Sequence, residues 1–113
     1  VFSPGIGIAA DALCSRAAQL PMIEIKKPER ILNSNTTLCM QAGLVYGYIG
    51  QVKYIVEQIK KEMGLPDMQV VATGGFSKVF DGELSCIDVY DSNLTLKGLQ
   101  IIASRNKKNG ERP

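Results

Sequence analysis

Hydrophobic positions recur with a helical period between Asn35 and Met63. Seven apolar residues there are separated by seven, four, three, four, three and four positions, so they share one stripe of a helix. Asn35 is a favourable N-cap, and Gly64 followed by Leu65-Pro66 is a typical helix end. The pattern therefore predicts one long helix over residues 35–63. The residues of the stripe are Leu38, Val45, Ile49, Val52, Val56, Ile59 and Met63.

Three glycines, Gly43, Gly47 and Gly50, lie on a second stripe of the same predicted helix, which we call the glycine stripe. Each glycine costs up to about 1 kcal/mol relative to alanine within a helix. Such residues are typical of a helix that another backbone approaches closely. We expect the glycine stripe to pack on a helix of the same chain or of a second copy, with a ligand-facing surface as the alternative. Lys53 and Glu57 argue against a membrane span.

The rest of the pattern alternates short strands with helices, which predicts an α/β fold. Ala-rich residues 9–20 favour a helix that Pro21 ends, and Thr95 is the expected N-cap of a final helix that reaches about Arg105. A sheet of three short strands is thin for an independent domain. The strands are expected at residues 1–3, 69–73 and 86–89, with a further extended piece at 22–26 and a short helix at 76–80.

Length and composition narrow the class of protein. The chain has 113 residues, of which 45% are hydrophobic, so it fits one globular domain and excludes a disordered tail or a disulfide scaffold. Its net charge of +2 is too small to indicate nucleic acid or a membrane surface as a partner. Histidine is absent, which removes Ser-His and Cys-His catalysis from these residues. Three cysteines without a CxxC motif predict buried free thiols in a reducing cytoplasm.

Two glycine-containing segments could bind a nucleotide. A predicted buried strand ends in Gly74-Gly75, where backbone N–H groups would be open to a phosphate or a flat nucleoside. An ordinary glycine turn is the alternative there. Residues 5–10 match the GxGxxA form of the dinucleotide fingerprint, with Glu24 near the expected ribose-binding position. A proline before the first glycine and a barely present strand favour a tight turn instead.

Hydroxyl and amide side chains gather at residues 33–37, just before the long predicted helix. Helix capping explains such a cluster, and a polar substrate held at the helix end is the alternative. Acidic residues are scattered along the chain, and none form a pair at a spacing that demands general acid/base chemistry. The 113 residues therefore show no convincing catalytic base.

Short motifs follow one another along residues 1–106 in an order that, taken together, resembles the C-terminal half of type III pantothenate kinases. Two positions depart from the family pattern: Ser92 stands where a proline is usual, and Phe76-Ser77 replaces smaller residues. The motifs are Ser3-Pro4-Gly5-Ile6, Ala17-Ala18-Gln19-Leu20-Pro21, Asn35-Thr36, Met40-Gln41-Ala42-Gly43, Gly47-Tyr48-Ile49-Gly50, Ala72-Thr73-Gly74-Gly75 and Asp91 with Leu94-Thr95-Leu96-Lys97-Gly98-Leu99.

This resemblance implies the C-terminal lobe of an actin-like, ribonuclease H-like kinase of the acetate and sugar kinase, heat-shock ATPase and actin superfamily. The lobe would span residues 1–106 as a short mixed sheet flanked by helices, followed by a polar tail at 107–113. The phosphate loops and the catalytic aspartate of the family precede the matching region. We therefore expect a missing N-terminal lobe, and no catalytic residue within this chain.

Enzymes of this family transfer the γ-phosphoryl group of ATP to pantothenate, so the resemblance implies that activity here. The product is 4'-phosphopantothenate, and the reaction is the first step of coenzyme A biosynthesis. The resemblance implies a cytoplasmic homodimer that needs Mg²⁺ and a monovalent cation, K⁺ or NH₄⁺. It implies that Thr36 contacts pantothenate across the dimer interface, that Gly74 and Gly75 line the adenosine, and that the glycine stripe forms the dimer contact. The fragment alone is expected to be inactive. A non-catalytic nucleotide-binding or dimerisation module is the alternative.

Overall fold

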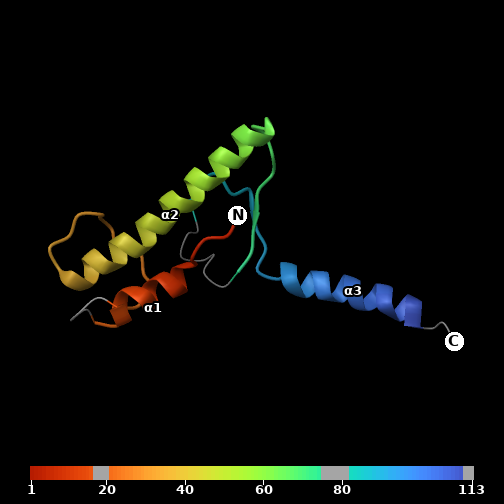
Figure 1. Ribbon diagram of the computed structural model, residues 1–113, viewed down its shortest axis with the longest axis horizontal. Helices are drawn as coiled ribbons and strands as arrows, with labels where there is room; N and C mark the ends of the chain where they lie inside the picture. The colour runs from red at the N-terminus through yellow and green to blue at the C-terminus, as the bar shows by residue number, and fades with distance from the viewer. Residues whose placement is uncertain (17–20, 75–81, 111–113) are drawn as a thin grey trace.

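The computed structural model describes residues 1–16, 21–74 and 82–110 (Figure 1). These residues form three helices and a two-stranded parallel sheet, a mostly helical α/β arrangement. In chain order the elements are α1 (Ile6–Arg16), α2 (Thr36–Met63), β1 (Val71–Ala72), β2 (Val89–Tyr90) and α3 (Leu94–Gly110).

Helix α2 is the element that the sequence predicted best. The side-chain oxygen of Asn35 accepts a hydrogen bond from the N–H of Leu38 at 3.2 Å, so Asn35 is the N-cap. At the other end Gly64 has φ 65°, and the N–H groups of Gly64 and Leu65 donate to the carbonyls of Lys61 and Lys60, each at 3.1 Å. The predicted helix over 35–63 is therefore confirmed at both of its caps.

The core lies where the middle of α2 meets α1 and the segment before β2. Val45 and Ile49 of α2 pack with Ile6 of α1 and with Leu84, and none of these four side chains is more than 9% exposed. Figure 1 shows α1 alongside the first half of α2. Only the middle of the predicted apolar stripe is buried in this core. The side chains of Leu38 and Met63, at the two ends of the stripe, are exposed.

The sheet is shorter and simpler than the sequence predicted. Val71 pairs with Val89 and Ala72 with Tyr90, and the two strands run parallel, so a mixed sheet is not what the described residues form. The side chain of Val71 is 47% exposed, which contradicts the expectation of a buried strand.

The expected strand at residues 1–3 is also wrong, because that segment is irregular coil. The piece expected to be extended at 22–26 joins no sheet in the described residues, and exposed and half-buried side chains alternate along it. Val1 and Phe2 are almost fully exposed. A strand needs a neighbour to accept and donate its backbone hydrogen bonds, and residues 1–3 have no such neighbour among the described residues.

Two helix boundaries differ from the prediction. The first helix begins at Ile6 rather than residue 9, and its predicted end at residues 17–20 lies outside the described residues, as does the helix expected at 76–80. The last helix begins at Leu94, and the N–H of Lys97 donates to the carbonyl of Asn93 at 2.8 Å, so Thr95 is not its N-cap. The helix continues through Gly110, so residues 107–110 of the expected polar tail are helical.

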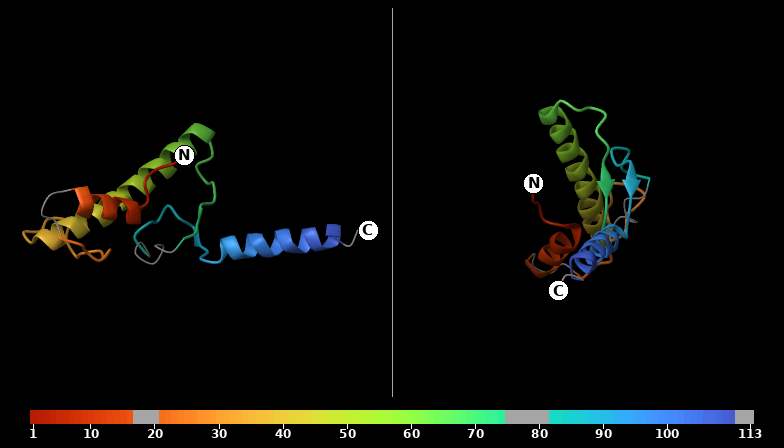
Figure 2. Two further views of the ribbon diagram at one scale, coloured as in Figure 1. Left: turned by 60° about the horizontal axis from the view of Figure 1, so that its bottom comes forward. Right: turned by 90° about the vertical axis from the view of Figure 1, so that its right-hand side faces the viewer.

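Helix α3 gives the molecule an elongated shape (Figures 1 and 2). The radius of gyration is 18.6 Å, whereas a compact domain of this length would have about 13 Å. The views agree that α3 points away from α1 and α2, and its large apolar side chains are all between 43% and 66% exposed. These side chains belong to Leu94, Leu96, Leu99, Ile101 and Ile102.

Candidate functional site

The N-terminal end of α2 carries the predicted substrate residue Thr36. Thr36 is the first helical residue and its side chain is exposed. Asn35 uses its side chain to cap the helix, so the capping explanation of the 33–37 cluster is confirmed for that residue. The hydroxyl of Thr36 stays available for a ligand, next to the positive end of the helix dipole.

The turn that leads into Thr36 is held by Asn33. Its side-chain amide donates to the carbonyl of Arg30 at 2.6 Å and to that of Ile31 at 3.2 Å. The thiol of Cys39 on α2 donates in turn to the carbonyl of Asn33 at 2.9 Å. The backbone before Thr36 is thereby fixed relative to the first turn of α2.

The segment before this turn, which we call the 24–33 loop, is anchored to α2 at two further points. Gln41 is buried, and its amide donates to the carbonyl of Glu24 at 3.0 Å. The hydroxyl of Tyr46 donates to the carbonyl of the buried Pro28 at 2.7 Å. Neither anchor was predicted, because each joins residues 17 or 18 positions apart through side chains that look ordinary in sequence.

Lys27 of the same loop lies between two partners. Its ammonium group forms an ion pair with Glu83 and lies 5.7 Å from the centre of the Tyr46 ring. The hydrogen bond from Lys27 to the Glu83 carboxylate raises the pKa of Lys27 above its ordinary value. This pair ties the 24–33 loop to the segment that carries the core residue Leu84.

Three open cavities surround the first half of α2. The one beside Thr36 measures about 360 Å³ and is also lined by Ser34 and Met40. A second, of about 550 Å³, lies along the 24–33 loop and combines Lys26 and Arg30 with Glu24 and Gln41. A third, of about 470 Å³, is lined by apolar residues and Tyr46, together with two glycines of the stripe. This end of α2 therefore offers hydroxyl, cationic and apolar surfaces to a small polar ligand.

The glycine stripe borders these cavities and is open. Gly43, Gly47 and Gly50 are exposed, and a Cβ atom placed on any of them would meet nothing within 4 Å. Packing on another helix of the same chain, one of the two expected arrangements, is therefore not seen in the described residues. The face remains accessible to a second copy.

The predicted nucleotide residue Gly74 follows β1 directly. Its φ of 126° falls in a region that side-chain-bearing residues rarely adopt, and it is exposed. Gly75 lies outside the described residues. In Figure 1 the strand β1 lies apart from the N-terminal end of α2, the helix that Thr36 begins.

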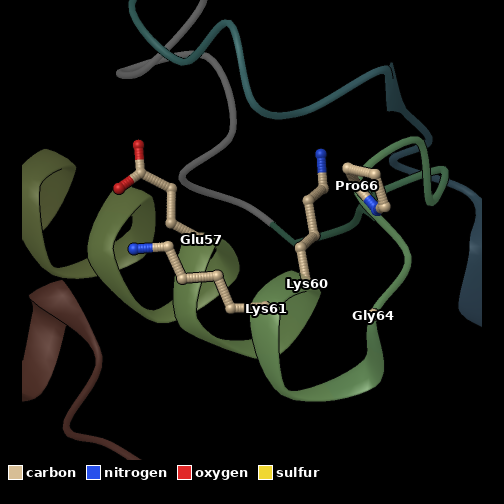
Figure 3. A pocket seen from close by; sticks show the side chains of 5 residues that line it. All are labelled: Glu57, Lys60, Lys61, Gly64 and Pro66. Carbon is tan, nitrogen blue, oxygen red and sulfur yellow. The ribbon is translucent and has the colours of Figure 1, made fainter.

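A further pocket, of about 320 Å³, lies at the C-terminal end of α2 (Figure 3). Figure 3 shows Glu57 and Lys61 side by side on the helix and Lys60 directed towards Pro66. Lysines are favourable at a helix C-terminus because the helix dipole is negative there. That electrostatic role accounts for both lysines, and the pocket contains none of the predicted ligand residues.

The dinucleotide fingerprint at residues 5–10 forms the beginning of α1 instead of a nucleotide loop. The N–H of Ala9 donates to the carbonyl of Gly5 at 3.0 Å, as at an ordinary helix start. Within the described ranges no strand precedes α1, whereas the dinucleotide motif needs one. The tight turn between sheet and helix, which was the alternative at this position, is not seen either, because α1 begins at Ile6 and no described strand precedes it.

Acidic side chains in the described residues do not converge. No group of three or more His, Cys, Asp or Glu side chains there could hold a metal ion. The three cysteines are free thiols, but the expectation that they are buried is wrong, because Cys39 is exposed and Cys14 and Cys86 are half-buried. Asp91 instead accepts hydrogen bonds from Lys97 and from the N–H of Asn93, and these hold the pKa of its carboxyl below the usual value. None of the described helices has a stretch long and apolar enough to cross a membrane.

The comparisons with known proteins all lead to the same protein family. A family model described as type III pantothenate kinase matches residues 1–58. A type III pantothenate kinase of Agathobacter rectalis is 48% identical over 110 residues, which are 97% of this chain and 42% of that protein. Those of Brevibacillus brevis and Moorella thermoacetica are 53% and 51% identical over 94% and 93% of this chain. The chain spans about two fifths of the length of these relatives.

Proposed function

This chain belongs to the type III pantothenate kinase family, and we propose that it is the C-terminal lobe of an enzyme that transfers the γ-phosphoryl group of ATP to pantothenate. The observation that carries the proposal is identity of about half over nearly the whole chain with proteins of that name. We propose residues 1–106 as an actin-like lobe that acts, in the cytoplasm, with an N-terminal lobe outside these 113 residues.

Thr36 is the proposed pantothenate contact. Its exposed hydroxyl stands at the first turn of α2 beside a cavity of about 360 Å³. A hydroxyl there can both donate to and accept from the polar groups of pantothenate, and the helix N-terminus favours a negatively charged carboxylate nearby. The fixed turn at Asn33 holds the hydroxyl in place without a rearrangement on binding.

Gly74 and Gly75 are the proposed contacts to the adenosine of ATP. Gly74 is exposed after β1, and its φ of 126° is one that residues with side chains rarely adopt. Because glycine has no side chain, a flat base or a ribose could approach the backbone there. We propose that this surface forms one wall of the nucleotide cleft and that the second wall belongs to the N-terminal lobe.

A homodimer through the glycine stripe is the proposed assembly. The exposed face of α2 at Gly43, Gly47 and Gly50 allows another backbone to approach closely. Because β1 lies apart from the end of α2 that Thr36 begins, the proposed dimer would let Thr36 of one protomer serve the active site of its partner. Pantothenate and ATP are the proposed small-molecule partners.

The phosphoryl transfer itself would depend on groups outside the described residues. ATP chemistry in such kinases uses Mg²⁺ to neutralise phosphate charge, and we propose a monovalent cation, K⁺ or NH₄⁺, as well. The described residues have no acidic cluster that fits either cation. We therefore propose that their ligands and the base that accepts the hydroxyl proton of pantothenate lie in the N-terminal lobe.

The test is the activity of the full-length gene product. We expect it to convert pantothenate and ATP into 4'-phosphopantothenate and ADP in the presence of Mg²⁺ and K⁺, measured by mass spectrometry of the product. The 113 residues alone are expected to show no turnover. A full-length product that is stabilised by ATP in a thermal-shift assay and yet shows no turnover would favour the alternative, a non-catalytic nucleotide-binding or dimerisation module.

A further inference from the structure

We propose that Lys27 is a positioning residue that holds the 24–33 loop, which leads into Thr36, against the segment of its own protomer that carries the core residue Leu84. This inference rests on the proposed function for the identity of the substrate. The loop itself has no regular secondary structure, so its position depends on the side chains that anchor it.

Two of the hydrogen-bonded anchors reach only α2. Gln41 holds the carbonyl of Glu24, and Tyr46 holds that of Pro28. Both fix the loop to the helix that Thr36 begins, and that helix is itself held in the core by Val45 and Ile49.

The ion pair of Lys27 with Glu83 reaches beyond the helix, and it adds a polar attachment to the packing of the partly buried Ile25 against the core. It joins residues 56 positions apart in the chain. Glu83 directly precedes Leu84, which is 5% exposed and packs against Val45 and Ile49. The Glu83 carboxylate is therefore attached to a well-packed point of the core.

The Glu83 segment is also joined to the sheet. The N–H of Asp88 donates to the carbonyl of Val70 at 2.9 Å, and the Asp88 carboxylate accepts from the N–H of Val70 at 2.7 Å. Val70 leads directly into β1, after which Gly74 follows. Lys27 is thus the polar link, beside the core packing of Ile25, between the 24–33 loop and the segment that joins the sheet of the same protomer.

The surroundings of Lys27 suit a positioning role. Its side chain is 29% exposed and that of Glu83 37%, and the Tyr46 ring adds a second attraction for the ammonium group. Partly exposed ion pairs contribute modestly, so removal should change an apparent affinity by about two- to five-fold. Lys27 lies in a loop with no reacting group of its own, and we therefore expect an effect on binding without one on the chemical step.

The test compares variants of the full-length gene product. Lys27→Met keeps the aliphatic stem and removes the charge, and Glu83→Gln removes the other partner. Each should raise the KM for pantothenate about two- to five-fold with kcat and the KM for ATP unchanged. The charge-swapped double variant, K27E/E83K, should return the KM to within about two-fold of the original. Lys53→Met, at an exposed lysine on α2, is the matched control and should change nothing.

An unchanged KM in both single variants, or a double variant no better than either single one, would overturn the proposal.

Hydrogen exchange of the 24–33 amides is a second measurement that does not depend on activity. Lys27→Met should accelerate exchange there, while Lys53→Met should not. If the unaltered protein fails to phosphorylate pantothenate, the proposed function fails. The exchange measurement then still decides the anchoring, and equal exchange in the two variants would reject it.

Discussion

Asp91 and Lys97 form an ion pair across the first turn of α3, with the ammonium nitrogen 2.8 Å from the carboxylate Oδ2. The other carboxylate oxygen accepts from the N–H of Asn93 at 3.0 Å. One side chain, directly after β2, therefore organises the start of α3. Of these contacts, the hydrogen bond from Lys97 contributes most to the lowered pKa of Asp91.

We predict that acid loosens the start of α3 before the core. A lowered pKa in the folded state means that Asp91 stabilises this turn above the pH at which a free carboxyl titrates, about 3.9. The contribution is lost as the pH falls through the lower folded pKa. The protection factors of the amides of residues 94–98, which are exchange rates corrected for the intrinsic rate at each pH, should therefore fall below about pH 4. Asp91→Asn should show low protection factors already at pH 7, with little further change on acidification. Equal pH profiles for the two proteins would contradict the assignment.

We predict that Val45→Ala is strongly destabilising. The Val45 side chain is fully buried among Ile6, Ile49 and Leu84. Its truncation should lower the free energy of unfolding of the full-length protein by about 2 to 3 kcal/mol, measured by urea denaturation.

Leu99→Ala on α3, where the side chain is 57% exposed, tests whether α3 is covered in the full-length protein. A cost below about 0.5 kcal/mol means that α3 stays open there.

We predict that Thr36→Val weakens pantothenate binding. The substitution keeps the shape of the side chain and removes one hydroxyl, so it should raise the KM for pantothenate by about two- to ten-fold. The neighbouring residue Thr37 is also exposed on α2, and Thr37→Val is the matched control. Equal effects of the two substitutions would show that the loss comes from the helix end and not from a contact of Thr36.

We predict that Gly47→Leu disrupts assembly and leaves the protomer folded. A Cβ atom at Gly47 meets nothing within 4 Å in the chain, so the new side chain has room in the monomer. In a closely packed dimer the same side chain would clash, and the dissociation constant should rise about tenfold or more. Light scattering across a dilution series measures it, with Lys53→Leu as the control on another face. A dimer indifferent to Gly47→Leu would place its interface elsewhere.

Local signals account for what could be predicted of the fold. Asn35 and Gly64 act on backbone groups within four residues of themselves, so the limits of α2 can be derived from sequence. The strand expected at residues 1–3 required a distant segment to pair with it. The apolar residues of 1–3 do not indicate whether such a second strand is present. The sheet was overestimated for this reason, and its two observed strands are only two residues long each.

The candidate site, like the fold, could be predicted from the sequence only in part. The family resemblance pointed to Thr36, and the structure adds that its side chain is exposed beside a cavity. The anchors of the 24–33 loop could not be predicted, because Lys27, Gln41 and Tyr46 meet partners 17 to 56 residues away. Nothing in the residue type of Gln41 distinguishes a buried backbone anchor from a surface amide.

The position of α3 has a consequence for how errors in this protein are detected. Every residue of the core, from Ile6 to Leu84, lies outside α3. The core can therefore close without α3. An error in the apolar face of α3 would leave a protein whose core has already formed, and quality control that detects a disrupted core would miss it.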